Sequence, residues 1–179
     1  SSDLLASASG SGSLGAQALN ETLPLALARL PEGDRPKTGH QAGRGKDAAT
    51  RAAYTQAGVE AWVVEFIDDM AEAYAWADLV ICRAGALTVS ELAAAGVAAL
   101  LVPYPYAVDD HQTANGNYLA RAGAALLIQQ RDLGPERLAG ELRALDRATL
   151  TRMAVTARSL AKPDATARFA DICEEVLAA

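Results

Sequence analysis

The sequence predicts an α/β protein built on a parallel β-sheet that is flanked by helices. Short apolar runs alternate along the chain with longer segments of helical period, which is typical of βαβ units. The 179 residues are 51% hydrophobic but only 5% aromatic, and alanine and leucine dominate the apolar set. Alanine favours helices, so the composition indicates a helix-rich or α/β protein rather than a β-sandwich. The length is that of one domain.

Four apolar runs are the clearest strand candidates, and they span residues 61–66, 79–82, 99–102 and 125–128. Residues 4–9 form a weaker candidate, because alanine and serine are poor strand formers. Residues 40–43 (HQAG) resemble the end of another strand and its turn. Helices are expected over 14–30, 47–57, 69–76, 87–95, 111–121, 135–145, 149–161 and 164–178. The last of these has Asp164 as its expected N-cap, directly after Pro163.

The charge balance and the segments that the sequence lacks argue against several classes of protein. The chain has 16 Lys and Arg against 22 Asp and Glu, a formal charge of −6, which does not suit nucleic-acid binding. Cys82 and Cys173 stand alone, as expected for reduced thiols in a cytoplasmic protein. No run approaches the ~20 apolar residues that span a bilayer, and the first residues lack the basic start of a signal peptide.

The first segment with an expected chemical role is the glycine-rich stretch 10–16, which lies between a strand and a helix. Its small residues let backbone N–H groups approach a phosphate, where the helix dipole favours negative charge. The stretch matches the dinucleotide-binding pattern G-x-G-x-x-G only formally, because that pattern is loose. The acidic residue usually found about twenty positions further on would be Asp34, which lies in a loop rather than at a strand end. An NAD(P)-binding oxidoreductase domain therefore stays open but is not preferred. Residues 6–13 (ASASGSGS) would also suit a flexible linker, although their position favours a turn.

The second segment, 82–91 (CRAGALTVSE), follows a strand and opens a helix. Its turn therefore lies at the carboxyl end of the sheet, where open α/β folds bind ligands. Two such turns, one near Gly12 and one near Gly85, would present two sets of N–H donors to one diphosphate. Glu91 would accept hydrogen bonds from two ribose hydroxyls. The alternative makes Thr88 an ordinary first-turn residue and Glu91 a solvated helix charge.

The third segment, 103–115, joins a proline-stiffened loop to the start of the next helix. His111, Gln112 and Asn115 share one helix face there and are expected to hydrogen-bond sugar hydroxyls. Asp109 and Asp110 are interpreted instead as helix-capping acids, the commoner role for such a pair.

Together these segments resemble the C-terminal half of the MurG-type glycosyltransferases. The resemblance covers nearly the whole chain and rests on residues 12–24, 40–45, 65–96, 102–105, 109–115 and 163–168. Family members transfer N-acetylglucosamine from UDP-GlcNAc to undecaprenyl-pyrophosphoryl-N-acetylmuramoyl-pentapeptide in peptidoglycan synthesis, which serves cell-wall biogenesis, cell shape and cell division. The resemblance implies a GT-B architecture, in which two Rossmann-like domains face each other across a cleft.

Residues 1–179 are then a single Rossmann-like nucleotide-sugar-binding domain, and the N-terminal acceptor domain is absent. By the resemblance, that other domain supplies the general base, the lipid-facing surface and the contact with the inner face of the cell membrane. No catalytic residue is therefore expected in this chain. Half of the cleft cannot hold both substrates in reactive geometry, so the isolated chain is expected to bind donor without turnover.

The resemblance also implies the donor-binding residues. They are Gly12, Ser13, Gly15, Ile67, Arg83, Ala86, Leu87, Thr88, Glu91, His111, Gln112 and Asn115. The glycine-rich loop and the helix start at 86–88 are expected near the diphosphate, and the Ile67 backbone is expected to read uracil. Arg83 lies in the donor site, and Glu91 binds ribose. His111 and Gln112 meet the GlcNAc hydroxyls, with Asn115 on the same face.

Neither a metal nor a cofactor is expected. The sequence has no acidic D-x-D triplet, and N–H donors at helix starts stabilise the charge on a departing UDP without a metal. The acceptor hydroxyl would attack the anomeric carbon in one inverting displacement, assisted by a general base.

Several positions depart from the family pattern. Ser11 replaces the glycine that usually precedes Gly12-Ser13, Ala98 stands where a proline is expected, and Gly39 and Gly116 look out of place. The first strand is alanine- and serine-rich instead of β-branched. These departures suggest an engineered or excised domain, and they support an alternative: an engineered α/β scaffold with a vestigial nucleotide site.

Overall fold

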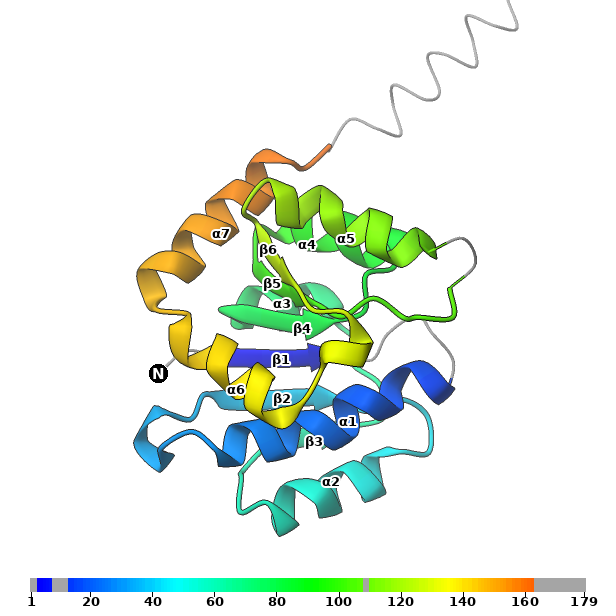
Figure 1. The fold of residues 1–179 in the computed structure, drawn as a ribbon, viewed down its shortest axis with the longest axis vertical. Coiled ribbons are helices and arrows are strands. Elements are labelled where there is room, and N and C mark those ends of the chain that lie inside the picture. The colour runs from blue at the N-terminus through cyan, green and yellow to red at the C-terminus, as the bar shows by residue number, and fades with distance from the viewer. Residues whose placement is uncertain (1–2, 8–12, 108–109, 163–179) are drawn as a thin grey trace, which may run out of the picture.

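Six parallel strands form one sheet in the order β3-β2-β1-β4-β5-β6 (Figure 1). The computed structural model describes residues 3–7, 13–107 and 110–162, without the side chains of 13–16. The strands are β1 (Asp3–Ser7), β2 (Lys37–Gln41), β3 (Trp62–Val64), β4 (Leu79–Cys82), β5 (Ala98–Leu101) and β6 (Ala125–Leu127). The predicted parallel α/β class is confirmed.

Seven described α-helices and two short 3₁₀ turns connect the strands. The helices are α1 (Ser13–Ala28), α2 (Asp47–Gln56), α3 (Met70–Trp76), α4 (Ala86–Ala95), α5 (His111–Arg121), α6 (Pro135–Ala144) and α7 (Arg147–Ser159). The 3₁₀ turns are η1 (Glu32–Asp34) and η3 (Gln130–Asp132). Each of these helices lies within two residues of its expected position. The helix expected at 164–178 lies outside the described residues.

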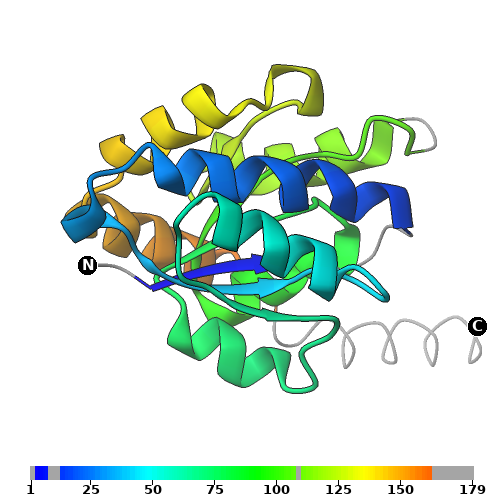
Figure 2. The same ribbon diagram turned by 90° about the horizontal axis from the view of Figure 1, so that it is seen from below.

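Alternation along the strands divides the core into two layers. In β1, Leu4 packs in one hydrophobic cluster and Leu5 in the other. The first cluster takes its apolar side chains mainly from α1, α2, α6 and the start of α7. The second takes them from α3, α4, α5 and the end of α7. Helices thus cover both faces of the sheet, with α1 and α2 opposite α3 (Figure 2).

β2 is the strand that the sequence pattern did not predict. Its sequence, KTGHQ, contains no apolar residue with high strand propensity, yet four of its five positions are buried. It forms because β1 and β3 pair with it on both sides, from Asp3 opposite Lys37 to Gln41 opposite Val64. Residues 40–43, interpreted as a strand end and turn, do lie where β2 ends.

Gly39 and Gly116, the two glycines that depart from the family pattern, have different structural settings. A Cβ atom at Gly116 would lie 2.8 Å from Leu127 Cδ1, so this glycine lets α5 pack closely on β6. A Cβ atom at Gly39 would lie 3.3 Å from the ring of Trp62 and 3.5 Å from that of Trp76.

Beside Gly39 lies an open groove on the α3 side of the sheet, with a volume of about 690 Å³. Its walls include three aromatic side chains that are unusually exposed, Trp62 at 58%, Phe66 at 67% and Trp76 at 41%. We call this feature the tryptophan groove. Ile67 contributes to the same wall, so the groove reaches the carboxyl end of β3.

Candidate functional site

The sheet changes winding direction between β1 and β4. These strands are neighbours, and Ser7, the last residue of β1, pairs in register with Cys82, the last residue of β4. The chain after β1 enters α1 on one face, whereas the chain after β4 enters α4 on the other. Such a reversal leaves a crevice at the carboxyl end of the sheet, which is the ligand site of open α/β folds. Ser7 and Cys82, the last strand residues before the glycine-rich and RAGA segments, therefore lie side by side.

The glycine-rich loop is only partly described. Gly12 lies outside the described residues, whereas Ser13 begins α1 and Gly15 lies in its first turn. Segment 6–13 thus contains the end of β1 and the start of α1, as expected for a strand-to-helix connection.

The second turn delivers backbone N–H groups at the start of α4. Gly85 is the N-cap in an extended conformation, and no side chain caps the helix. Ala86 and Leu87 are exposed, Leu87 to 80%, whereas Thr88 is buried, with 7% of its surface exposed. The first N–H groups of an α-helix have no partner within the helix, so they are suited to bind an anion.

Glu91 lies one turn further along α4 and is hydrogen-bonded by a described residue of α3. The buried Tyr74 on α3 donates its hydroxyl hydrogen to Glu91 Oε2 at 3.0 Å. Burial, assisted by Cys82 and Glu91, raises the pKa of Tyr74, so the phenol stays protonated and remains a donor. The contact of Tyr74 with Glu91 is a tertiary feature that sequence spacing does not indicate.

Cys82, directly under this turn, is a structural thiol. It is buried, and burial raises its pKa to about 12, with a further contribution from the Glu91 charge. A thiol that stays protonated is a poor nucleophile, so Cys82 is not a catalytic candidate.

Arg83 points into the protein, with only 1% of its surface exposed. Its guanidinium donates to the carbonyl oxygens of Val102 at 3.0 Å and Pro103 at 3.3 Å, and to Gln130 Oε1 at 2.6 Å. It also lies 5.6 Å from the ring centroid of Tyr104. Burial lowers the pKa of Arg83, but arginine stays protonated in proteins. Arg83 therefore anchors the loop after β5 to the RAGA turn.

That loop is joined in turn to the start of α5. The Tyr104 N–H donates to Gln112 Oε1 at 2.9 Å, and Asn115 Nδ2 donates to the carbonyl oxygen of Ala84 at 3.3 Å. Gln112 and Asn115 are half-buried, and these bonds hold them beside the loop after β5 and the RAGA turn. His111 is exposed at the first position of α5.

Two aspartates at helix starts behave differently from each other. Asp69 caps α3 by accepting the Glu72 N–H at 2.8 Å. Asp110 is the N-cap residue of α5, but its side chain makes no capping bond and its φ is 53°, in the left-handed region. Asp109 lies outside the described residues.

The backbone of Ile67 is held by a residue that the sequence reasoning did not single out. Gln41, at the end of β2, accepts the Ile67 N–H through Oε1 at 2.9 Å, and its Nε2 lies 3.5 Å from Ser7 Oγ. A polar residue at the end of a buried strand was the one available signal. Ile67 is itself buried, with 6% of its surface exposed.

Behind Gln41 lies a buried polar network. The ring of His40 is hydrogen-bonded to Tyr54 Oη and to Asn20 Oδ1, each at 2.9 Å. Asn20 Nδ2 donates to the carbonyl oxygen of Ala42 at 2.9 Å. This network joins α1 and α2 to the carboxyl end of β2.

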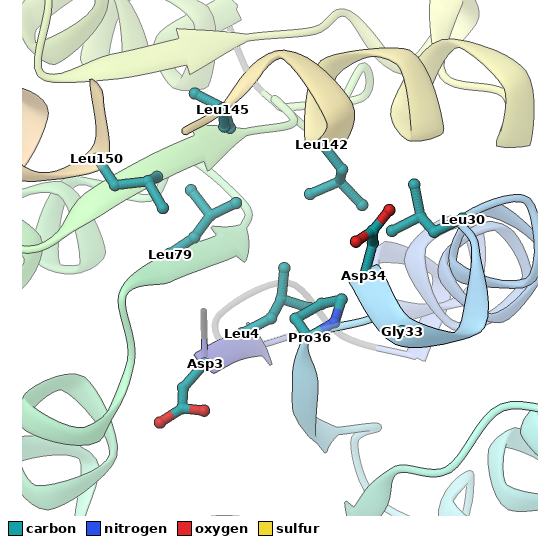
Figure 3. A pocket seen from close by; sticks show the side chains of 10 residues that line it. All are labelled: Asp3, Leu4, Leu30, Gly33, Asp34, Pro36, Leu79, Leu142, Leu145 and Leu150. Atoms are coloured by element: carbon teal, nitrogen blue, oxygen red, sulfur yellow. The ribbon is translucent and has the colours of Figure 1, made fainter. Parts of the chain in front are cut away.

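A smaller cavity lies at the opposite end of the strands (Figure 3). It has a volume of about 180 Å³, and its lining includes Leu4, Leu79 and Leu150 near the amino ends of β1 and β4. This cavity is thus separate from the candidate site.

No group of three or more His, Cys, Asp or Glu in the described part of the chain is arranged to hold a metal ion. None of the described helices combines the length and apolar character needed to cross a bilayer.

The strand order and the reversal between β1 and β4 define a lobe of the open α/β type. Residues 10–176 match the model of the glycosyltransferase family 28 C-terminal domain, and the chain belongs to this family.

Proteins similar in sequence and in structure agree with this assignment. A UDP-N-acetylglucosamine–N-acetylmuramyl-(pentapeptide) pyrophosphoryl-undecaprenol N-acetylglucosamine transferase of Marinobacter nauticus is 60% identical over 166 residues, which cover 92% of this chain and 46% of that protein. The crystal structure of Acinetobacter baumannii MurG superimposes with a TM-score of 0.88 at 47% identity, covering 98% of this chain and 52% of that one.

A more distant structure, the glycosyltransferase of kitacinnamycin, shares the fold at a TM-score of 0.69 and 23% identity, covering 97% of this chain and 43% of that one. The predicted GT-B-type Rossmann-like lobe and the predicted MurG-type resemblance are confirmed. The chain spans about half the length of the relatives it matches.

Proposed function

We propose that this chain is the donor-binding half of a UDP-GlcNAc-dependent N-acetylglucosaminyltransferase that converts lipid I into lipid II in peptidoglycan synthesis. Its ligands are then UDP and UDP-GlcNAc, and its partner is an N-terminal acceptor domain. That partner would supply the lipid site, the general base and the contact with the inner face of the membrane.

The observation that carries this proposal is the register pairing of Ser7 with Cys82. Each residue ends a strand just before a segment expected to bind phosphate, which supports a site where the N–H groups at the starts of α1 and α4 meet one diphosphate. A diphosphate carries two charged groups in a row, and oriented N–H donors bind them at little cost in reorganisation.

The rest of the donor fits around the crevice between β1 and β4. The Ile67 backbone, beyond the carboxyl end of β3, would bind uracil, and the Glu91 carboxylate on α4 would accept hydrogen bonds from vicinal ribose hydroxyls. Gln112 and Asn115 each use one end of the amide in the bonds described above, which leaves the other end for GlcNAc hydroxyls.

The same arrangement supports a metal-independent, inverting reaction. N–H groups at the starts of α1 and α4 would stabilise the charge that develops on UDP as the glycosidic bond breaks. The acceptor hydroxyl would attack from the opposite side, with its proton taken by a base on the other half. Alone, this chain binds donor and does not turn it over.

Calorimetric titration tests the proposal directly. We expect saturable binding of UDP and UDP-GlcNAc by the isolated chain, and about tenfold weaker binding of UDP by Glu91→Gln, because a charge-assisted hydrogen bond is lost. The control is Glu141→Gln, which changes a glutamate on α6, remote from the crevice, and should leave UDP affinity unchanged.

A ligand variant locates the contact. 2′-Deoxy-UDP should bind the wild-type chain more weakly than UDP, and Glu91→Gln should discriminate less between the two. Absence of saturation with millimolar UDP would refute donor binding. Equal discrimination by both proteins would remove Glu91 from the ribose site.

A further inference from the structure

The Gln41 side chain connects two segments that are far apart in sequence. It is 98% buried, accepts the Ile67 N–H at 2.9 Å through Oε1, and reaches Ser7 Oγ at 3.5 Å with Nε2. Ser7 is the last residue of β1, directly before the glycine-rich loop. One amide therefore spans from the expected phosphate end of the site to the expected base end.

The segment that carries Ile67 depends on β2 for its position. The Ala42 N–H donates to the Val64 carbonyl oxygen at 2.8 Å, and the Gly43 N–H to that of Glu65 at 3.1 Å. The bond from Ile67 to Gln41 extends this row by one more contact, and here a side chain takes the place of the backbone. This hydrogen bond between the Ile67 segment and β2 therefore depends on the identity of residue 41.

The other side of the site rests on the same end of β2. Asn20, on α1, hydrogen-bonds both the Ala42 carbonyl oxygen and the ring of His40. The helix that follows the glycine-rich loop and the backbone of Ile67 are thus both fixed to residues 40–42. A buried amide costs free energy unless its ends are bonded, so packing alone does not explain a glutamine at this position.

We propose that Gln41 is a positioning residue that sets the Ile67 backbone for the nucleobase and ties it to the start of the phosphate loop. This inference rests on the proposed function. Because Gln41 Oε1 already takes the Ile67 N–H, the backbone group that Ile67 offers to a base is its carbonyl oxygen. The base must then bring an N–H donor, which uracil has at N3.

A cycle between protein and ligand tests the coupling. UDP and N3-methyl-UDP differ only at the atom expected to face Ile67, and Gln41→Met removes the amide at nearly constant size. For the wild-type chain we expect N3-methylation to weaken binding about tenfold. For Gln41→Met we expect UDP binding to weaken about tenfold and N3-methyl-UDP binding to change little, so that the preference for UDP nearly disappears.

Two control variants separate positioning from stability. Tyr54→Phe removes a hydroxyl from the buried network, and Thr38→Val removes the bond from Thr38 Oγ1 to the Pro36 carbonyl oxygen at the other end of β2. Neither touches Ile67, so both should keep the wild-type preference for UDP even where the melting temperature falls. A preference that Gln41→Met leaves unchanged overturns the inference, as does a similar loss in either control.

Amide hydrogen exchange provides a test that needs no ligand to bind. In the wild-type chain the Ile67 amide should be protected, and Gln41→Glu, which keeps an acceptor oxygen, should keep most of that protection. An Ile67 amide that exchanges at the rate of a free peptide overturns the inference, whatever the affinity for UDP. A protected amide in a chain that does not bind UDP leaves the tie intact and refutes the proposed function alone.

Discussion

Buried polar side chains at the carboxyl ends of the strands carry the specific contacts of this lobe. Gln41 holds Ile67, Arg83 holds the loop after β5, and His40 joins two helices to β2. Each lies within or next to a strand, so backbone pairing fixes its Cα position and the side chain determines what the neighbouring loop does. Such residues convert the regular sheet into a defined site.

His40 makes the stability of the fold depend on pH. Burial lowers its pKa from 6.5 to about 4, so the folded chain stays neutral there while an unfolded chain takes up a proton. The unfolded state binds more protons between these two values, and stability is therefore lost as the pH falls from 6.5 towards 4. The full loss corresponds to about 3 kcal/mol. Urea denaturation at a series of pH values measures it.

The matched variant is His40→Gln, which cannot titrate in this range. Its free energy of unfolding should be lower than that of the wild type near neutral pH, and the difference should shrink as the pH approaches about 5. Carboxylate titration affects both proteins alike. Parallel pH profiles for the two proteins would show that His40 is not the titrating group.

The individual contacts of these residues could not be predicted from the sequence. The motif pattern correctly placed Arg83 and Glu91 at a strand-to-helix turn. It did not reveal that Arg83 points inward or that Tyr74 donates to Glu91, because both depend on the packing of α3, η3 and the loop after β5. Gln41 was recognised only as part of a strand end.

Among the elements, the described helices and the apolar strands were predicted within two residues, since each carries its own periodic pattern. β2 was missed because its stability comes from its neighbours: Lys37, Gly39 and Gln41 are poor strand formers that β1 and β3 hold in place. Local propensity predicts an element only where the element determines its own conformation.

Glycines within helices show how far local helix propensity determines the stability of one element. Gly140 lies in α6, and a Cβ atom there would meet nothing within 4 Å. Gly140→Ala should therefore gain the full difference in helix propensity, about 1 kcal/mol, and raise the melting temperature by about 2–4 °C. Thermal denaturation followed by circular dichroism measures the change.

Gly116 in α5 is the matched comparison. A Cβ atom there would lie 2.8 Å from Leu127 Cδ1 and 3.2 Å from Ala84 Cβ, so the same gain in propensity is offset by steric strain. Gly116→Ala should be less stable than Gly140→Ala. Equal gains at both positions would mean that α5 does not require a glycine for its packing on β6.

For the whole molecule, the question is whether this lobe retains a working site or only the fold. A ligand that binds the folded state alone stabilises it by mass action, by about 2.7 kcal/mol at a hundredfold excess over its dissociation constant. We expect UDP and UDP-GlcNAc to raise the melting temperature and NADH to leave it unchanged. Differential scanning calorimetry with each ligand makes the comparison.

The three interpretations of the sequence differ in this experiment. An engineered scaffold with a vestigial site would melt at the same temperature with every ligand, and an oxidoreductase domain would respond to NADH. A shift with UDP that is absent in Glu91→Gln would associate the gain in stability with the crevice between β1 and β4.

The tryptophan groove gives this chain an unusual optical property. Trp62 and Trp76 are its only tryptophans, and both are partly exposed on a wall that they share with Ile67. Unfolding should therefore shift their emission wavelength less than it would for fully buried tryptophans. A change in intrinsic fluorescence during a titration would instead report an event at the end of β3.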